Sequence, residues 1–339
     1  MDNGSQRIRR MTGTDEELHV LADALRAGNL VAIPTETVYG LAANALDEAA
    51  CRRIFEVKGR PLIDPLIVHV TGIEHAEKLA EVSDAARALM ERYWPGPITF
   101  VMKRRSVVPD IISAGLPTVA LRCPRHPLTR KLLSMCGLPL SAPSANRFGY
   151  VSPTCAEHVI TGLGDRIDYV LDGGPCDIGL ESTIVGLADP ENPVLFRPGA
   201  ISRKELSEVL GREVALPERR VDSGPMDAPG MLSRHYSPKT PLTLFDGGAI
   251  PARDSSADGR EAVVLFAHPD VAPLWTSGAE VFWFSESGQP MEAARNVFSL
   301  LRNLDSGGYS RIYAERSPLG GIGEAINDRL GRAAATSRR

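Results

Sequence analysis

Four basic side chains stand beside predicted strand ends, and together they have the chemistry to bind a triphosphate. Lys58 and Arg60 lie two residues apart in the stretch KGRPLIDPLIVHV, while Arg122 and Arg197 each close an apolar run. If residues 58–60 are extended, the first two side chains leave the backbone on the same side. An arginine offers phosphate oxygens a planar fork, and a lysine offers them a point charge. Taken singly, each could instead be a solvated turn residue or half of an ion pair.

Small polar residues gather at the same strand ends. Thr35 and Ser144 each follow a proline, and Thr183 lies in the stretch ESTIVGL. Crevices outside strand ends are where open α/β sheets bind ligands. Hydroxyl groups there suit a zwitterionic or anionic ligand, although a hydrogen-bonded turn would use the same residues. His69 lies within an apolar run, so it either lines this pocket or is a satisfied core histidine.

The elements that must position these residues alternate between strand and helix. Strands are predicted at 29–34, 65–70, 98–103, 118–124 and 138–146, a hairpin at 182–199, and helices at 47–57, 83–94 and 127–137. Thr14 with Glu17 and Ser202 with Glu205 have the capping-box spacing that begins a helix. The alternation favours an α/β sheet with covered faces. On the strand at 118–124, the side chains of Thr118, Ala120 and Arg122 should share one face.

Composition argues against several classes of protein. The chain has 339 residues, 43% of them hydrophobic and 24% charged, which is typical of a globular protein with room for two domains. Its net charge of −4 argues against a protein that coats nucleic acid. Five cysteines without C-x-x-C spacing favour reduced thiols over zinc or disulfides. Neither an apolar signal region nor a membrane-spanning run is visible, which predicts a cytoplasmic protein with no membrane contact.

A proline-rich stretch divides the chain into two parts. The segment PERRVDSGPMDAPGMLSRHYSPKTP has few apolar residues, and a structureless stretch of this length is either a passive tether or functional. Strand-like runs follow at 242–246, 261–269, 279–285 and 309–315, with a helix at 291–304 before the last of them. We therefore expect a catalytic domain at 1–211, a linker at 212–240 and a smaller α/β domain at 241–339.

Eight stretches resemble, in order, motifs of the long-form threonylcarbamoyl-AMP synthases: PTETVYGLAANA, KGRPLIDPLIVHV, WPGPITFVM, TVALRCPRHP, PLSAPSAN, ESTIVGL, LFRPGAIS and SRHYSPKTPL. The resemblance runs from about residue 15 to residue 330. It implies an open, twisted, mixed sheet with helices (YrdC-like), followed by a linker and a smaller Rossmann-like α/β domain. It also implies that L-threonine, bicarbonate and ATP, with Mg²⁺, give L-threonylcarbamoyladenylate and pyrophosphate, the first step of N6-threonylcarbamoyladenosine formation in tRNA.

The resemblance also implies roles for individual residues. Lys58 and Arg60 would be catalytic. The residues that would contact L-threonine are Thr35, His69, Arg122 and Thr183. The residues that would contact ATP are Arg60, Asp64, Thr118, Ala142, Ser144, Ser152, Arg197 and Tyr236. The linker, which carries Tyr236, would close over the cleft as a lid and shield a labile carboxylated amine from water.

Two positions depart from the family pattern. Asp64 stands where the family usually has asparagine, and a carboxylate there could repel the phosphates or help to hold Mg²⁺. Ala142 stands where serine or threonine is frequent, so that only a backbone contact could survive. The metal ligands are not identified by the sequence, and Mg²⁺ is expected to arrive on the ATP phosphates.

The expected partners are the three small-molecule substrates and a tRNA threonylcarbamoyl transferase complex, which would take up the product. A weak contact with tRNA is a further expectation. Two alternatives remain at this point. One is a module that binds RNA or tRNA, against which the negative net charge counts. The other is a carbamoyltransferase-type maturation factor, although the zinc-finger and acylphosphatase modules of such proteins are not visible here.

Overall fold

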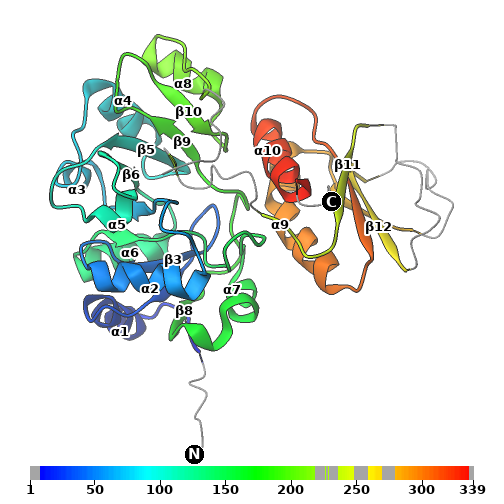
Figure 1. The fold of residues 1–339 in the computed structure, drawn as a ribbon, viewed down its shortest axis with the longest axis horizontal. Coiled ribbons are helices and arrows are strands. Elements are labelled where there is room, and N and C mark those ends of the chain that lie inside the picture. The colour runs from blue at the N-terminus through cyan, green and yellow to red at the C-terminus, as the bar shows by residue number, and fades with distance from the viewer. Residues whose placement is uncertain are drawn as a thin grey trace, which may run out of the picture. The chain divides into compact units, whose positions relative to one another are not determined.

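The computed structural model describes residues 8–217, 226, 228, 236–247, 259–268 and 279–335. The chain forms two compact units (Figure 1). The first unit runs to residue 232 without the segments 149–151 and 178–180, and the second consists of those two segments and the chain from residue 233. The limits at residues 211 and 240, which separate the expected catalytic domain, linker and smaller domain, stay a prediction.

Within its described residues, the first unit holds a ten-stranded sheet in the order β1-β8-β2-β3-β7-β4-β6-β5-β9-β10. The strands are β1 (Arg9–Met11), β2 (Val31–Ile33), β3 (Gly40–Asn44), β4 (Ile67–His69), β5 (Ile98–Lys103), β6 (Thr118–Arg122), β7 (Leu140–Ser141), β8 (Tyr169–Leu171), β9 (Thr183–Gly186) and β10 (Val194–Arg197). The helices are α1 (Asp15–Arg26), α2 (Glu48–Lys58), α3 (Ile73–Ala76), α4 (Asp84–Tyr93), α5 (Asp110–Ser113), α6 (Pro127–Cys136), α7 (Ala156–Leu163), the 3₁₀ helix η1 (Gly164–Arg166) and α8 (Arg203–Leu210).

The pairing of these strands confirms the expected mixed α/β sheet. β4 and β6 run parallel, β5 and β6 antiparallel, and the predicted hairpin is the antiparallel pair β9 and β10. Both predicted capping boxes are present, at Thr14 before α1 and at Ser202 before α8. The sequence did not predict β1, nor β3 in the stretch GLAAN, where small side chains leave little strand signal.

The two faces of this sheet are covered differently. One face packs its apolar side chains, among them Val68 and Leu121, against residues of α2, α4 and α7. The opposite face packs on α1 and α6 over β2, β3 and β7. Over β4, β6, β5 and β9 the same face carries a small cluster of Ile67, Val101, Ala120, Ile184, Phe196 and Ala228. Among the described residues this cluster contains no helical side chain, and Ala228 is its one member from outside the strands.

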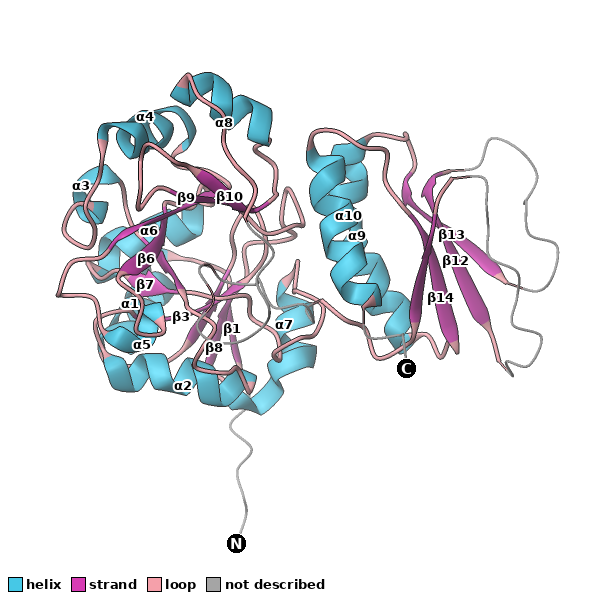
Figure 2. Ribbon diagram, turned by 45° about the horizontal axis from the view of Figure 1, so that its top comes forward, coloured by secondary structure: helices cyan, strands magenta, loops and turns pink. Residues whose placement is uncertain are grey.

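The described part of the second unit is a parallel sheet, and its two described helices lie on one face of that sheet (Figure 2). Its described strands, in spatial order, are β11 (Leu242–Phe245), β14 (Arg311–Glu315), β12 (Glu261–Ala267) and β13 (Glu280–Ser285). The long helix α9 (Pro290–Ser306) and α10 (Ile322–Ala334) lie side by side against it. This arrangement confirms the Rossmann-like expectation. None of the helices that the structure describes is long and apolar enough to cross a membrane.

Candidate active site

Register brings several predicted site residues into one row across the open part of the sheet. His69 on β4 lies opposite Arg122 on β6, and Arg122 lies opposite Thr99 on β5. Thr99 lies opposite Ile184 on β9, which in turn lies opposite Arg197 on β10. Side chains of directly opposed residues share one face of a sheet. We call His69, Arg122, Thr99 and Arg197 the polar row.

A β-bulge is needed to complete this row. The register of β10 against β9 shifts between Leu195 and Arg197, and such a shift re-aims the side chains that follow it. Leu195 therefore packs in the main core, while Arg197 comes opposite Ile184. The Arg197 Nε donates to the Ser182 carbonyl at 3.0 Å and its Nη2 to Ser182 Oγ at 3.1 Å. Ser182 Oγ also shares a hydrogen bond of 2.8 Å with Thr99 Oγ1, so Arg197 is tied to the middle of the row.

Arg122 forms a buried ion pair with Glu36. Its Nη2 lies 2.8 Å from Glu36 Oε1, and the two side chains are 5% and 0% exposed. Burial acts to raise the pKa of Glu36, but the Arg122 guanidinium and backbone N–H groups hold it below its usual value. The Nε of Arg122 is buried and has no hydrogen-bond partner among the described residues. One N–H of the guanidinium is therefore left for a ligand.

The ring of the neighbouring His69 has no hydrogen-bond partner among the described residues. Both of its ring nitrogens are buried and unpaired among the described residues. Burial, and then the charge of Arg122, lower the pKa of His69 to about 3, so the ring is neutral at physiological pH. A buried polar atom without a partner costs roughly 1–3 kcal/mol. This finding counts against a satisfied core histidine and favours a ring that meets a ligand.

Lys58 and Arg60 do not share one extended segment, which corrects the expectation from sequence. Lys58 is the last residue of α2, and Gly59 ends the helix in the left-handed conformation with φ of 64°. The Lys58 ammonium donates to the carbonyls of Ser144 and Asn146. Burial, and then the charge of Arg60, lower its pKa. Lys58 therefore ties the end of α2 to the loop after β7.

Asp64 forms an ion pair with Arg60, a role not considered from the sequence. The Arg60 Nη2 lies 2.9 Å from Asp64 Oδ2, with the side chains 4% and 0% exposed. The same guanidinium donates to the carbonyls of Asp64 at 3.0 Å and Pro65 at 2.7 Å. Arg60 is thus folded onto its own loop, and part of its charge is neutralised there.

The two predicted threonine contacts outside the row make local hydrogen bonds. Thr35 Oγ1 donates to the Val38 carbonyl at 2.6 Å and shapes the turn that carries Glu36. Thr183 Oγ1 donates to the Ile201 carbonyl at 2.9 Å. Both hydroxyls are therefore already bonded within the protein, and a ligand would have to share them.

Two predicted ATP contacts are likewise bonded within the protein. The N–H of Ala142 donates to the Ile67 carbonyl at 2.9 Å, so a backbone contact with a ligand would use the Ala142 carbonyl. Ser152 Oγ donates to Glu181 Oε1 at 2.5 Å. Both residues are buried.

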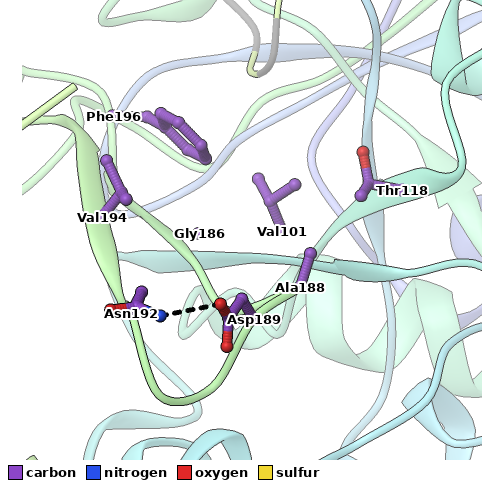
Figure 3. Close-up of a pocket in the computed structure, with 8 residues that line it drawn as sticks. All are labelled: Val101, Thr118, Gly186, Ala188, Asp189, Asn192, Val194 and Phe196. Carbon is purple, nitrogen blue, oxygen red and sulfur yellow. Dashed lines mark hydrogen bonds between the residues drawn. The ribbon is translucent and has the colours of Figure 1, made fainter. Parts of the chain in front are cut away.

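Thr118 lines a pocket beside the polar row, on the same strand as Arg122 (Figure 3). The pocket has a volume of about 200 Å³ and is lined by Val101, Thr118, Gly186, Ala188, Asp189, Asn192, Val194 and Phe196. A Cβ atom at Gly186 would lie 2.4 Å from the Phe196 ring, so glycine lets that ring pack close. Asn192 Nδ2 donates to Asp189 Oδ2 at 2.8 Å on the rim. Its apolar walls and flat ring suit the nucleoside end of a ligand.

Tyr236 belongs to the second unit. Its ring is buried, stacks on Phe298 of α9 at 5.5 Å, and lies 5.4 Å from the Arg329 guanidinium carbon. Its backbone has φ of 64°. Residues 233–235, the part of its motif that precedes it, lie outside the described residues, and the contact of Tyr236 with ATP stays a prediction.

Sequence reasoning assigned no role to Glu36, Thr99 or Ser182. Glu36 offered a signal, because it is the one carboxylate in the turn directly after the predicted strand at 29–34. Thr99 offered a weaker signal as a single hydroxyl within ITFVMK. Among the described residues, no three His, Cys, Asp or Glu side chains come together as a metal site.

Comparison with known proteins places both parts of the chain. Residues 23–199 match the family model described as "Telomere recombination" (Sua5, YciO and YrdC), and residues 201–335 match "Threonylcarbamoyl-AMP synthase, C-terminal domain". The threonylcarbamoyl-AMP synthase of Pyrococcus abyssi is 40% identical over 327 residues, 94% of each chain. That of Bacillus subtilis is 39% identical over 96% of this chain and 94% of its own.

Solved structures agree with this placement. The crystal structure of P. abyssi Sua5 complexed with L-threonine superimposes with a TM-score of 0.85, at 38% identity over 97% of both chains. A variant of the same protein, with a histidine and the following tyrosine replaced by alanine, also gives 0.85, at 36% identity over 98% of this chain and 97% of its own.

Proposed function

This chain belongs to the threonylcarbamoyl-AMP synthase family, and we infer from this that it makes L-threonylcarbamoyladenylate from L-threonine, bicarbonate and ATP with release of pyrophosphate. It is thus a nucleotidyltransferase of tRNA modification. The observation that carries the inference is the match to synthases over 94% or more of the chain. Relatives of that coverage favour synthesis over the alternatives of an RNA-binding module or a carbamoyltransferase.

We propose that His69 and Arg122 form the threonine end of the site. The free Nε of Arg122 would donate to the threonine carboxylate, because a guanidinium matches a carboxylate in geometry and charge. The neutral ring of His69 lies directly beside it and can accept one hydrogen bond and donate another. Thr35 and Thr183 would add hydroxyl contacts. A crystallised relative that carries L-threonine supports this assignment.

We propose that the nucleotide lies along the sheet from this row towards the pocket at Thr118. Its adenosine end would enter the pocket between Val101 and Phe196, and its phosphates would meet Arg197 and Arg60. The further ATP contacts of this proposal are Ala142, Ser144 and Ser152, while Asp64 would act on ATP through its ion pair with Arg60. Lys58 would act by holding Ser144 and Asn146 in place. Mg²⁺ would arrive with the ATP phosphates.

We propose that residues 212–240 form a lid between a catalytic domain (1–211) and a C-terminal domain (241–339). Ala228 is fully buried on the sheet face that carries the polar row, against Ile67 and Ala120. The N–H of Met226 donates to the Ile63 carbonyl at 3.1 Å, next to the Arg60–Asp64 loop. A linker in this position would exclude water from a labile carbamate.

In the proposed sequence of steps, the neutral threonine amine forms a bond to the carbon of bicarbonate, the C–OH bond breaks, and the hydroxyl leaves as water with a proton from the amine. The resulting carbamate oxygen attacks the α-phosphorus, and the bond from that phosphorus to pyrophosphate breaks. Catalysis then needs positioning and charge neutralisation, and no covalent nucleophile. Burial raises the pKa of the Cys123 thiol, which argues against a reactive thiolate there. We also propose that the product passes to a tRNA threonylcarbamoyl transferase complex in the cytoplasm, with at most a weak tRNA contact.

The test is a pyrophosphate-release assay with ATP and Mg²⁺, from which threonine or bicarbonate is left out in turn. We expect release only with both present. Arg197→Ala should abolish it, while Arg52→Ala, which removes an arginine paired with Glu48 on the exposed side of α2, should leave the rate unchanged. Release that needs neither threonine nor bicarbonate would refute the proposed function.

A further inference from the structure

Glu36 ties two distant parts of the first unit together at the polar row. It lies in the turn after β2, whereas Arg122 ends β6, 86 residues further along the chain. Oε1 of Glu36 accepts from Arg122 Nη2 at 2.8 Å, and Oε2 accepts from the N–H of Arg125 at 3.0 Å. Both carboxylate oxygens are therefore used on one short stretch, Arg122 to Arg125, and the side chain has no exposed surface.

This geometry argues against a role in proton transfer. A general base needs an oxygen that can reach the proton it removes, and each oxygen of Glu36 already accepts a hydrogen bond. The pKa of Glu36 is held below its usual value despite its burial, so the group stays ionised and its charge serves Arg122. By contrast, Arg122 keeps one buried N–H without a partner. The ligand-directed group of the pair is thus the arginine.

We propose that Glu36 is the positioning residue for Arg122, and that it holds the guanidinium so that its free Nε–H meets the carboxylate of L-threonine. This rests on the proposed function. An arginine has several rotatable bonds, and an unanchored guanidinium would lose side-chain freedom each time threonine binds. The Glu36 anchor removes that loss in advance. It also prevents Arg122 from turning towards the nucleotide phosphates, so that the arginine remains reserved for the amino acid.

The test compares Glu36→Gln with the unchanged chain in the pyrophosphate-release assay. Glutamine keeps the size of the side chain but removes its charge, so Arg122 is held more weakly. We expect KM for L-threonine to rise about 10- to 100-fold, the fold-change that corresponds to loss of one charge-assisted hydrogen bond to the threonine carboxylate. The values of kcat and of KM for ATP should change little. The matched control is Glu77→Gln, which breaks the half-exposed pair with Arg87 and should leave all three constants unchanged.

A second readout separates positioning from general loss of structure. L-threonine binding is measured by calorimetry in Glu36→Gln, in Arg122→Ala and in the double variant. If Glu36 acts through Arg122, the double variant binds threonine as weakly as Arg122→Ala alone. Additive losses would overturn the proposal, as would an unchanged KM in Glu36→Gln or the loss of an ionisation from its pH–rate profile. If Glu36→Gln does not fold, Glu36→Asp is used, and an unchanged threonine affinity there would equally count against the anchor.

These outcomes are distinct from failure of the proposed function. If the unchanged chain releases pyrophosphate without threonine, the function is wrong, whatever Glu36 does. If the unchanged chain requires threonine but Glu36→Gln retains its threonine affinity, the function stands and the positioning role falls.

Discussion

The substitution Asp64→Asn gives a sharp test of how the site handles charge. In the structure Asp64 neutralises Arg60 across 2.9 Å, with both side chains buried. Asparagine keeps the shape of the side chain but removes its charge. The two bonds from Arg60 to the carbonyls of residues 64 and 65 do not involve the carboxylate, so they remain. The variant therefore isolates the ion pair.

Two effects of opposite sign follow. Breaking a buried pair costs about 3–5 kcal/mol, and because the carbonyl bonds remain we expect a loss in unfolding free energy near the lower end. For a domain of this size, about 3 kcal/mol lowers Tm by about 6–12 °C. In exchange, the Arg60 guanidinium becomes available to ATP. One charge-assisted hydrogen bond is worth about 1.5–3 kcal/mol, which corresponds to ATP binding about 10- to 100-fold tighter.

The assay is thermal unfolding with and without MgATP, combined with calorimetric titration of MgATP at several Mg²⁺ concentrations. We expect the Tm of Asp64→Asn without ligand to be lower than that of the unchanged chain. We also expect MgATP to raise the Tm of the variant by more than it raises the Tm of the unchanged chain. The control is Glu48→Gln, which breaks the surface pair with Arg52. A pair this exposed contributes about 0–1 kcal/mol, so neither Tm nor ATP affinity should move.

The opposite result would refute this reasoning. If Asp64 held Mg²⁺, its replacement would weaken MgATP binding and shift the Mg²⁺ dependence. An unchanged Tm of the free variant would show that the Arg60–Asp64 pair is not the stabilising contact described here.

Two further predictions concern His69 and Gly199. The folded pKa of His69, about 3, lies below its unfolded value of 6.5, so its contribution to stability is complete above pH 6.5 and is lost as the pH falls towards 3. At pH 5 the loss is about 2 kcal/mol. His69→Gln should therefore reduce the difference between urea-unfolding free energies at pH 7 and pH 5 by that amount, and an unreduced difference would contradict a neutral buried ring. A Cβ atom at Gly199 would lie 2.3 Å from the Thr183 nitrogen, so Gly199→Ala should displace β9, cost about 1–3 kcal/mol and slow pyrophosphate release. Gly72→Ala, with no atom within 4 Å of the new Cβ, is its control, and equal melting of the two variants would argue against the clash.

Much of the fold could be predicted because it rests on local patterns. A period of two placed Thr118, Ala120 and Arg122 on one face of β6, and Ala120 lies in the cluster opposite the main core. The capping boxes at Thr14 and Ser202 depend on four consecutive residues each. Arg122 and Arg197 were recognised as site candidates because each is an arginine that closes an apolar strand.

Other features could not be predicted because they join residues far apart in the chain. The position of Arg197 in the polar row depends on a register shift in β10, which has no signature in the stretch PVLFRPG. The prediction that Lys58 and Arg60 leave one extended segment on the same side was wrong, because Gly59 ends α2 with a left-handed turn. The partner of Arg122, on a turn 86 residues away, follows from the order of strands in the sheet.

By itself, the sequence determined which side chains can bind an anion, which segments become strands and helices, and which synthase family the motifs match. These depend on residue type and short spacing, and both can be seen in one dimension. The tertiary structure decided which cations are already neutralised, by Asp64 and Glu36, and which polar atoms, on His69 and Arg122, are left for a ligand. The physical reason is that charge pairing and desolvation depend on distances across the folded chain, which are set by strand order and register.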